Sequence, residues 1–392
     1  MPYSRQDERF MQRALALARR GVGRTSPNPA VGAVLVSGGK IIGEGWHKRA
    51  GGAHAEIEAL KGKGKAARGG TLYVTLEPCC TWGRTPPCTE AVIAAGIRRV
   101  VVAALDPNPR HSGRGLRLLR QAGIRVDAGL LAQEAGQLNA AFNKWITTGQ
   151  PLVIAKAAMS LDGKIATRTG DSQWITSPAA RRVAHRWRAR VDAVMVAAGT
   201  VVRDNPRLTL RHGVRGRQPW RVVVDARGRS PRSARLFTDR ARQRTIVVTT
   251  VRSSVRWRRA LERRSVTVLI VKRAGEHVDL RAMLRELGKR EITSVLVEGG
   301  GDLLGALFAQ RLVDEAVFLY APVVIGGRDA KTAVEGAGVG RVRAAWRFAG
   351  EWRTLPGGEV MFVGRRRAGG SDRHPASAGC PRKLRMNKPF QR

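Results

Sequence analysis

Apolar and polar residues follow two periods along this chain, a helical one and an alternating one. Apolar side chains at helical spacing predict a first helix that starts after Ser4 and ends at Gly21. The apolar runs 31–36 and 40–45, joined by a glycine-containing turn, predict a β-hairpin. Strands that alternate with helices imply a mostly parallel sheet covered on both faces. The same patterns predict helices at 53–60, 89–95, 116–122 and 134–145, and strands at 72–76, 99–105 and 124–126.

The pattern restarts near residues 147–151, where a turn-rich segment separates two α/β halves. Ser177 and Pro178 predict the N-cap and first turn of a helix at 179–190. We expect two domains, 1–148 and 149–367, followed by a disordered basic tail at 368–392. Other elements expected in the second half are strands at 152–157, 193–196, 221–224, 245–249, 266–271 and 294–297, helices at 280–287 and 303–309, and a closing strand at 316–325.

The composition favours a folded protein in a reducing compartment. Of the 392 residues 43% are hydrophobic, yet no apolar run is long enough to span a bilayer. Charged residues interrupt the N-terminus, so we expect neither a secretory signal nor a membrane partner. Three of the four cysteines lie within ten residues, which favours a metal site over a disulfide framework. The expected location is therefore cytoplasmic.

The net charge of +41 points towards phosphate-bearing partners, since basic proteins bind nucleic acids through their phosphates. The arginines are scattered, however, and the two predicted domains contain neither a block of five or six basic residues nor an interleaving of aromatic and basic residues. This scatter favours a solvated surface and phosphorylated small molecules over a dedicated nucleic-acid site.

The segment 54–88 contains the residue types of a zinc-dependent base deaminase. His54, Cys79 and Cys88 offer one imidazole and two thiols, which can hold zinc and leave a fourth position for water. Glu56 follows the histidine by two residues at a predicted helix start, where a carboxylate beside the metal can move protons during deamination.

Two further features refine this candidate metal site. The carboxylates Glu58 and Glu77 are less well placed than Glu56 for proton transfer. Cys88 directly precedes a predicted helix, whose positive dipole end favours a thiolate at that position.

Eight residues separate Cys79 from Cys88, where the short deaminase signature has two. With this spacing come motifs in both halves of the chain. Together they resemble, in order and over about residues 5–365, the RibD family of bifunctional riboflavin-biosynthesis deaminase-reductases. The motifs are EPC at 77–79, GRTPPC at 83–88, AGI at 95–97, DPNP at 106–109, SLDGK at 160–164, SQWITS at 172–177, GTV at 199–201, DNP at 204–206 and VEGG at 297–300.

The resemblance implies an α/β protein with an N-terminal cytidine-deaminase-like α/β/α domain followed by a dihydrofolate-reductase-like α/β domain. In that family the zinc ligands correspond to His54, Cys79 and Cys88, and the catalytic carboxylate to Glu56. Cys80 and Thr81 stand where the family usually has serine and histidine. Cys80 is then an alternative or redox-sensitive thiol, or an inert small residue.

The second half contains a strand followed by a glycine run at 299–301 and a helix. This geometry can present backbone N–H groups to a phosphate, although glycines also serve tight turns. No Rossmann glycine fingerprint occurs, and the resemblance instead implies NADPH bound in the manner of dihydrofolate reductase. Ala226 stands where the family has a serine that contacts the cofactor. The NADPH contacts implied are Ala158, Trp174, Thr200, Asp204, Gly300, Gly301, Asp302, Leu303, Leu304, Gly305 and Ala306.

Substrate contacts are implied at Ser172, Arg188, Leu208, Arg211 and Glu298. The arginines suit a sugar phosphate, because a guanidinium binds phosphate through two parallel hydrogen bonds. In so basic a chain a solvated face is the alternative for either of them.

The expected function is therefore a two-step one on a small phosphoribosylaminopyrimidine substrate, with Zn²⁺ and NADPH as cofactors. The first domain deaminates 2,5-diamino-6-ribosylamino-4(3H)-pyrimidinone 5′-phosphate, and the second reduces the ribosyl group to give 5-amino-6-(5-phosphoribitylamino)uracil. We also expect a homo-oligomer and no dedicated nucleic-acid partner. The alternatives are a nucleic-acid deaminase, which leaves the second domain without a role, and a non-catalytic nucleic-acid-binding protein on a degenerate enzyme fold.

Overall fold

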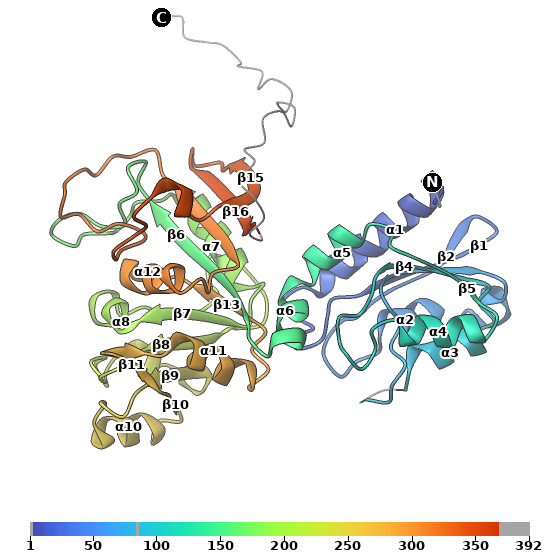
Figure 1. Cartoon of the computed structure of the whole chain (residues 1–392), viewed down its shortest axis with the longest axis horizontal. Helices are drawn as coiled ribbons and strands as arrows, with labels where there is room; N and C mark the ends of the chain where they lie inside the picture. Colours follow the sequence, from blue (N-terminus) through green and yellow to red (C-terminus); the bar gives the residue numbers. More distant parts are fainter. Residues whose placement is uncertain (1–2, 84–85, 368–392) are drawn as a thin grey trace, which may run out of the picture.

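The computed structural model describes residues 3–83 and 86–367 (Figure 1). The predicted tail at 368–392 and the Arg84-Thr85 pair of the cysteine loop lie outside the described residues. Two α/β lobes are visible, and the chain passes from the first to the second where α6 ends and β6 begins (Figure 1). The expected domain boundary at 148/149 falls in this turn and stays a prediction.

The first lobe is built on a five-stranded sheet in the order β2-β1-β3-β4-β5. Strands β3, β4 and β5 are parallel, whereas β1 pairs antiparallel with β2 and β3, so the sheet is mixed. Helices α1 and α5 cover one face, and α2, α3 and α4 cover the other (Figure 1). The elements are α1 Arg5–Ala18, β1 Gly32–Ser37, β2 Lys40–Trp46, α2 Ala55–Leu60, β3 Thr71–Leu76, α3 Cys88–Ala94, β4 Arg99–Ala104, α4 Arg114–Gln121, β5 Arg125–Ala128, α5 Ala132–Leu138 and α6 Ala140–Thr148.

The expected helix at 134–145 is wrong as a single element, because the structure divides it into α5 and α6 at Asn139. The Asn139 side chain is buried and binds both backbone groups of Ala30: its Oδ1 accepts from the N–H at 2.8 Å, and its Nδ2 donates to the C=O at 3.0 Å. This tertiary pairing holds Asn139 outside the regular helical path, a preference that a sequence period cannot reveal.

The second lobe contains a nine-stranded sheet in the order β10-β9-β8-β7-β13-β6-β14-β16-β15. Neighbours from β10 to β14 are parallel, and β14-β16-β15 is antiparallel. Its strands are β6 Leu152–Met159, β7 Ala193–Ala197, β8 Trp220–Val224, β9 Thr245–Thr249, β10 Thr267–Ile270, β13 Ser294–Val297, β14 Glu315–Tyr320, β15 Phe348–Thr354 and β16 Val360–Arg366. A separate two-stranded hairpin is formed by β11 Arg273–Ala274 and β12 His277–Val278.

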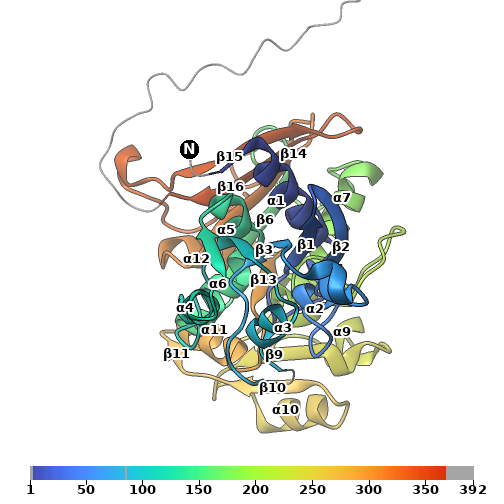
Figure 2. The same cartoon turned by 90° about the vertical axis from the view of Figure 1, so that its right-hand side faces the viewer.

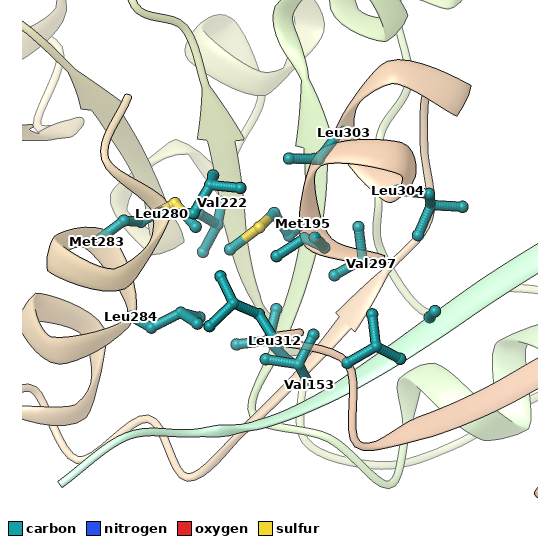
Figure 3. Close-up of a cluster of buried hydrophobic side chains, with 14 of the residues drawn as sticks. Val153, Met195, Val222, Leu280, Met283, Leu284, Val297, Leu303, Leu304 and Leu312 are labelled. Carbon is teal, nitrogen blue, oxygen red and sulfur yellow. The ribbon is translucent and has the colours of Figure 1, made fainter. Parts of the chain in front are cut away.

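Helices α11 and α12 pack on one face of this sheet, and α7, α9 and α10 pack on the other. Figure 3 shows the first of these cores, where Met195, Val222 and Val297 of the strands meet Met283 of α11 and Leu303 of α12. The helices are α7 Pro178–Arg188, α8 Ala198–Asp204, α9 Arg235–Thr238, α10 Val255–Glu262, α11 Leu280–Gly288 and α12 Gly301–Ala309. The Ser177 hydroxyl accepts a hydrogen bond from the Ala180 N–H, which confirms the predicted cap of α7.

The prediction of a closing strand in this lobe is wrong. The expected strand at 316–325 ends at Tyr320, and it does not close the sheet, because β16 and β15 extend it further. The sequence of β15 reads FAGEWRT and all but its first residue are exposed, so its pattern lacks the apolar alternation of a half-buried strand.

The two lobes contact each other through polar groups as well as packing, and Figure 2 views the molecule from the side of the first lobe. The Ser26 hydroxyl donates to Asp192 at 2.6 Å, and Lys144 Nζ binds Asp314 at 2.5 Å. A cavity of about 690 Å³ lies between the lobes. Among residues 3–83 and 86–367, no helix has both the length and the apolar character needed to cross a membrane.

Candidate active sites

The three predicted zinc ligands meet at one point of the first lobe, although they come from three separate segments. His54 directly precedes α2, Cys79 follows β3, and Cys88 is the first residue of α3. His54 Nδ1 lies 3.1 Å from Cys88 Sγ and 3.5 Å from Cys79 Sγ, and all three donor atoms lie within 4.8 Å of one another. Zinc bonds of about 2.0–2.3 Å to nitrogen and sulfur fit donors at such separations.

The helix start acts on a different thiol from the expected one. The backbone N–H of Cys88 points at Cys79 Sγ at 3.3 Å, so the positive end of α3 favours a thiolate at Cys79. Hydrogen bonding from the Cys88 thiol, opposed by burial and assisted by His54, lowers the pKa of Cys79 below its ordinary value. The Cys79 thiolate and burial raise the pKa of Cys88 in return. A divalent cation bound between these two sulfurs would favour the thiolate form of both.

Glu56 lies in the first turn of α2 beside the three donors, and only 3% of its surface is exposed. Burial, and the nearby Cys79 charge, raise the pKa of Glu56 to about 7. A carboxyl group with such a pKa exchanges protons readily at neutral pH. Glu58, two residues further along α2, is instead paired with Lys48 at 2.7 Å.

Glu77 has a structural role that its position before Pro78-Cys79 did not reveal. Its buried carboxylate accepts hydrogen bonds from the backbone N–H groups of Asp106 at 3.2 Å, Gly113 at 2.8 Å and Gly115 at 2.9 Å. A Cβ at Gly115 would lie 2.3 Å from the Pro78 carbonyl oxygen, so only glycine permits this approach. Glu77 thus ties the loop before α4 to the segment that carries Cys79.

We predict that Glu77→Gln lowers the free energy of unfolding by about 1–3 kcal/mol, because charge-assisted hydrogen bonds to a buried carboxylate are lost and an amide NH₂ faces backbone N–H groups. Urea unfolding followed by circular dichroism measures this change. Glu90→Gln, an exposed substitution on α3, is the matched control. Equal stability of the two variants contradicts the structural role of Glu77.

His47 borders the candidate metal site and Asn28 contacts His47, and neither was among the expected site residues. The His47 and His54 rings lie edge to face with centroids 5.2 Å apart. His47 Nδ1 lies 2.9 Å from the Ala53 carbonyl oxygen, and its Nε2 lies 3.1 Å from Asn28 Nδ2. If Nδ1 donates to the carbonyl, Nε2 accepts from the amide, and the Asn28 Oδ1 is left to accept from a ligand. The prolines on both sides of Asn28 were the available signal for this rigid turn.

Cys80 is half-buried beside the metal site, with its Sγ 3.5 Å from His111 Nδ1. Burial raises the pKa of the Cys80 thiol, so its environment does not favour the thiolate that a redox-sensitive or metal-binding role needs. Cys80 is also outside the group of three converging donors.

Two cavities border the glycine turn of the second lobe, which follows β13 and begins α12. The smaller, of about 180 Å³, and the larger, of about 1000 Å³, share Thr200, Arg203 and Gly300 in their linings. Several residues expected to bind cofactor or substrate border them. The smaller cavity is lined by Ala158, Ser172, Thr200, Asp204, Glu298, Gly300 and Leu304, and the larger one by Thr200, Gly300, Asp302, Leu303, Gly305 and Ala306.

The remaining expected residues line neither of these two cavities: Trp174, Arg188, Leu208, Arg211 and Gly301. Trp174 is 68% exposed and stacks under the Arg181 guanidinium, 4.2 Å from the ring centroid. Leu208 is buried in the core, and the backbone N–H of Arg211 donates to His185 Nδ1 at 3.0 Å.

Gly301 and Gly305 are required by packing within the protein. A Cβ at Gly301 would lie 2.3 Å from Glu335 Cγ, and one at Gly305 would lie 1.9 Å from the Glu335 carbonyl oxygen. Both glycines therefore let the segment around Glu335 approach α12. A run of glycines in the sequence does not distinguish this role from phosphate binding, whereas Gly300, with φ of +70°, does border both cavities.

A buried charge network lies beside the smaller cavity. Arg188 forms a bidentate pair with Glu298, with Nε to Oε1 at 2.6 Å and Nη2 to Oε2 at 2.9 Å, and Lys156 Nζ lies 3.7 Å from the same carboxylate. Burial alone would raise the pKa of Glu298, but the two cations lower it to about 2. Burial lowers the pKa of Lys156. Arg188 and Glu298 were expected from the resemblance, whereas Lys156 was not, because a lone lysine in a strand has no distinguishing signal.

Comparisons with known proteins agree with both lobes. Residues 4–104 match the family model of the cytidine and deoxycytidylate deaminase zinc-binding region, and residues 151–357 match that of the RibD C-terminal domain. The riboflavin biosynthesis protein RibD of Aquifex aeolicus is 45% identical over 320 residues, which cover 82% of this chain and 88% of that protein. Its counterpart in Escherichia coli is 45% identical over 333 residues, covering 82% and 89%.

Solved structures extend this similarity to three dimensions. RibD of Acinetobacter baumannii superposes with a TM-score of 0.83 at 37% identity, covering 93% of this chain and 99% of that one. A diaminohydroxyphosphoribosylaminopyrimidine deaminase/5-amino-6-(5-phosphoribosylamino)uracil reductase from Thermotoga maritima gives a TM-score of 0.80 at 37% identity, covering 92% and 99%.

Proposed function

The chain belongs to the RibD family of bifunctional deaminase-reductases, and on this premise we propose which of its residues carry each reaction. It is an enzyme of riboflavin biosynthesis with a zinc-dependent deaminase domain and an NADPH-dependent reductase domain, and its substrate is a small molecule. The observation that carries the assignment of the first site is the convergence of His54, Cys79 and Cys88 beside the buried Glu56.

The first reaction is the hydrolytic deamination of 2,5-diamino-6-ribosylamino-4(3H)-pyrimidinone 5′-phosphate. When bound to His54, Cys79 and Cys88, zinc supplies the Lewis acidity that makes water a nucleophile at neutral pH. Glu56 accepts a proton at its carboxylate from the attacking water and delivers it to the departing amine, which leaves as ammonia. The Asn28 amide oxygen accepts a hydrogen bond from the pyrimidine and orients the ring.

The second reaction reduces the ribosyl chain to give 5-amino-6-(5-phosphoribitylamino)uracil. NADPH supplies the hydride, and the protein aligns the sugar with the cofactor and provides a proton. Lys156 lines the smaller cavity and its buried ammonium group is the proton donor. Glu298, held by Arg188, keeps that ammonium group charged and in place. Thr200 and Gly300, which line both cavities, would hold the cofactor where the two cavities meet.

The proposal also includes the cellular location, the substrate residues and the oligomeric state. A cytoplasmic location suits the free thiols of Cys79, Cys80 and Cys88 and a need for NADPH. The nucleic-acid deaminase and the non-catalytic binder each leave the reductase domain without a role. Ser172, Arg188, Leu208, Arg211 and Glu298 remain the proposed substrate residues, and a homo-oligomer remains a prediction.

A coupled assay tests the whole assignment. Purified protein loaded with zinc should release one ammonia per substrate, and NADPH absorbance should fall only after the deaminated product forms or is supplied. Treatment with a chelator should abolish ammonia release, while the reduction of supplied deaminated product continues. Failure of ammonia release in the zinc-loaded protein contradicts the first assignment, and stable NADPH absorbance with the supplied product contradicts the second.

A further inference from the structure

Arg227 lines the larger reductase cavity and shares one carboxylate, that of Glu276, with a second arginine, Arg252. Arg227 follows β8, Arg252 follows β9, and both guanidinium groups bind the same oxygen of Glu276. Arg227 and Glu276 line the larger cavity together with Gly300. Two guanidinium groups that converge on one oxygen form a site for an anion with more than one negative oxygen.

The backbone presents these arginines from a fixed framework. The buried Asp225 carboxylate accepts hydrogen bonds from the N–H groups of Arg229 at 2.9 Å and Ser230 at 2.7 Å, which shapes the turn that carries Arg227. The Thr250 hydroxyl donates to the Ala226 carbonyl oxygen at 2.7 Å, which ties the turn after β8 to the turn after β9. The two guanidinium groups are therefore near each other before any ligand binds.

Glu276 is a replaceable occupant of this site. It lies in the turn between β11 and β12, and half of its side chain, 51%, is exposed. Exposed ion pairs contribute little to stability, about 0–1 kcal/mol, because water solvates the separated charges well. A phosphate carries more charge and more acceptor oxygens than a carboxylate, so it can displace Glu276 from both arginines.

The position of Arg227 in the lining of the larger cavity indicates which phosphate the two arginines would bind. Gly300, at the start of α12, is where the two cavities meet, and the dinucleotide phosphates belong there if the nicotinamide lies in the smaller cavity beside Lys156. The adenosine half then occupies the larger cavity, whose volume of about 1000 Å³ accommodates it; Arg227 lines this cavity, whereas Lys156 lines the smaller one. NADPH differs from NADH only by a phosphate on the adenosine 2′-oxygen.

We infer that Arg227 and Arg252 bind the 2′-phosphate of NADPH in exchange for Glu276, and that this exchange makes the enzyme select NADPH over NADH. The inference rests on the proposed reductase function and adds the residues that determine its cofactor specificity. Because Glu276 competes with the phosphate for the two arginines, it limits the affinity for NADPH. When NADH binds, Glu276 can stay paired with both arginines, so they are not left without a counter-charge.

Equilibrium binding measured by calorimetry tests the inference without turnover. The probes are NADPH, NADH, and the fragments adenosine 2′,5′-bisphosphate and adenosine 5′-monophosphate. The double variant Arg227→Gln/Arg252→Gln should bind NADPH and the bisphosphate about 30-fold more weakly or worse, since two charged hydrogen-bonding groups are lost. Its affinity for NADH and the monophosphate should change by about two-fold at most. Glu276→Gln should bind NADPH about 3- to 10-fold more tightly.

Helix α11 offers matched controls, because Glu286 is also bridged by two cations, Lys289 at 2.7 Å and Arg290 at 3.4 Å. Arg290→Gln and Glu286→Gln should leave all four affinities unchanged. An equal loss of NADPH and NADH binding in the double variant, or no loss of either, overturns the inference. Weaker or unchanged NADPH binding in Glu276→Gln overturns the exchange. Wild-type protein that binds neither dinucleotide contradicts the reductase function itself, which separates that failure from the failure of this inference.

Discussion

Glu56→Gln should reduce the rate of ammonia release by about 10²–10⁴-fold while the enzyme retains its zinc, because the loss of a positioned proton-transfer group costs about this much. Glutamine keeps the size of the side chain but cannot carry the proton between water and the departing amine. The variant should still oxidise NADPH at the wild-type rate when deaminated product is supplied, since Glu56 belongs to the first lobe and the reductase cavities to the second. Ammonia assays, metal analysis and NADPH absorbance measure the three quantities.

Glu58→Gln is the control for this variant. It lies on the same helix two residues later, but its carboxylate pairs with Lys48 at the surface instead of facing the donors. It should deaminate at close to the wild-type rate. Equal rates for Glu56→Gln and wild type contradict the proton-transfer role, and loss of zinc from Glu56→Gln contradicts its position outside the ligand set.

Glu298→Gln should abolish reduction and lower the free energy of unfolding by about 3–5 kcal/mol, because Arg188 and Lys156 would remain buried without their shared counter-charge. Guanidinium chloride unfolding measures the second effect. Neutralising Lys156 as well, in Lys156→Gln/Glu298→Gln, should recover part of the lost stability without restoring reduction. Glu286→Gln, which removes an exposed carboxylate from α11, should change stability by no more than about 0.5 kcal/mol.

The effect of Glu298→Gln on stability should depend on pH in a defined direction. The folded-state pKa of Glu298, about 2, lies below the ordinary value of 4.5, so the stabilisation is complete above pH 4.5 and decreases as pH falls towards 2. The difference in unfolding free energy between wild type and variant should therefore be constant near neutrality and narrow in acid. A difference that instead widens in acid contradicts the buried network as the source of stability. So does a Glu298→Gln variant that loses reduction but is as stable as the wild type.

Most regular elements could be predicted from the sequence, because their signals are local. The hairpin of β1 and β2, the Ser177 cap of α7 and the buried strands of both sheets all follow from periodicity or capping over a few residues. The failures involve tertiary contacts. Asn139 leaves the helical path to bind Ala30, more than a hundred residues away, and β15 is a strand because it pairs with β16 and not because of its own pattern.

The candidate sites show the same division. The metal ligands carry rare side chains in a characteristic spacing, so His54, Cys79 and Cys88 could be named in advance. Lys156, Asn28 and His47 are common residue types, and their importance comes from burial and from neighbours distant in the sequence. Likewise, nothing local distinguishes Glu77, which holds a loop, from Glu56, which faces the metal ligands.

The sequence by itself determined the class of chemistry, because zinc ligation and deamination require specific residue types that motifs record directly. Only the tertiary structure decided which of several residues of the same type takes each role. It placed the start of α3 against Cys79 and brought Arg227 and Arg252 together on Glu276. It also distinguished Gly300, which borders both cavities, from Gly301 and Gly305, which packing requires. The reason is that charge, burial and distance govern these roles, and they are properties of the folded arrangement.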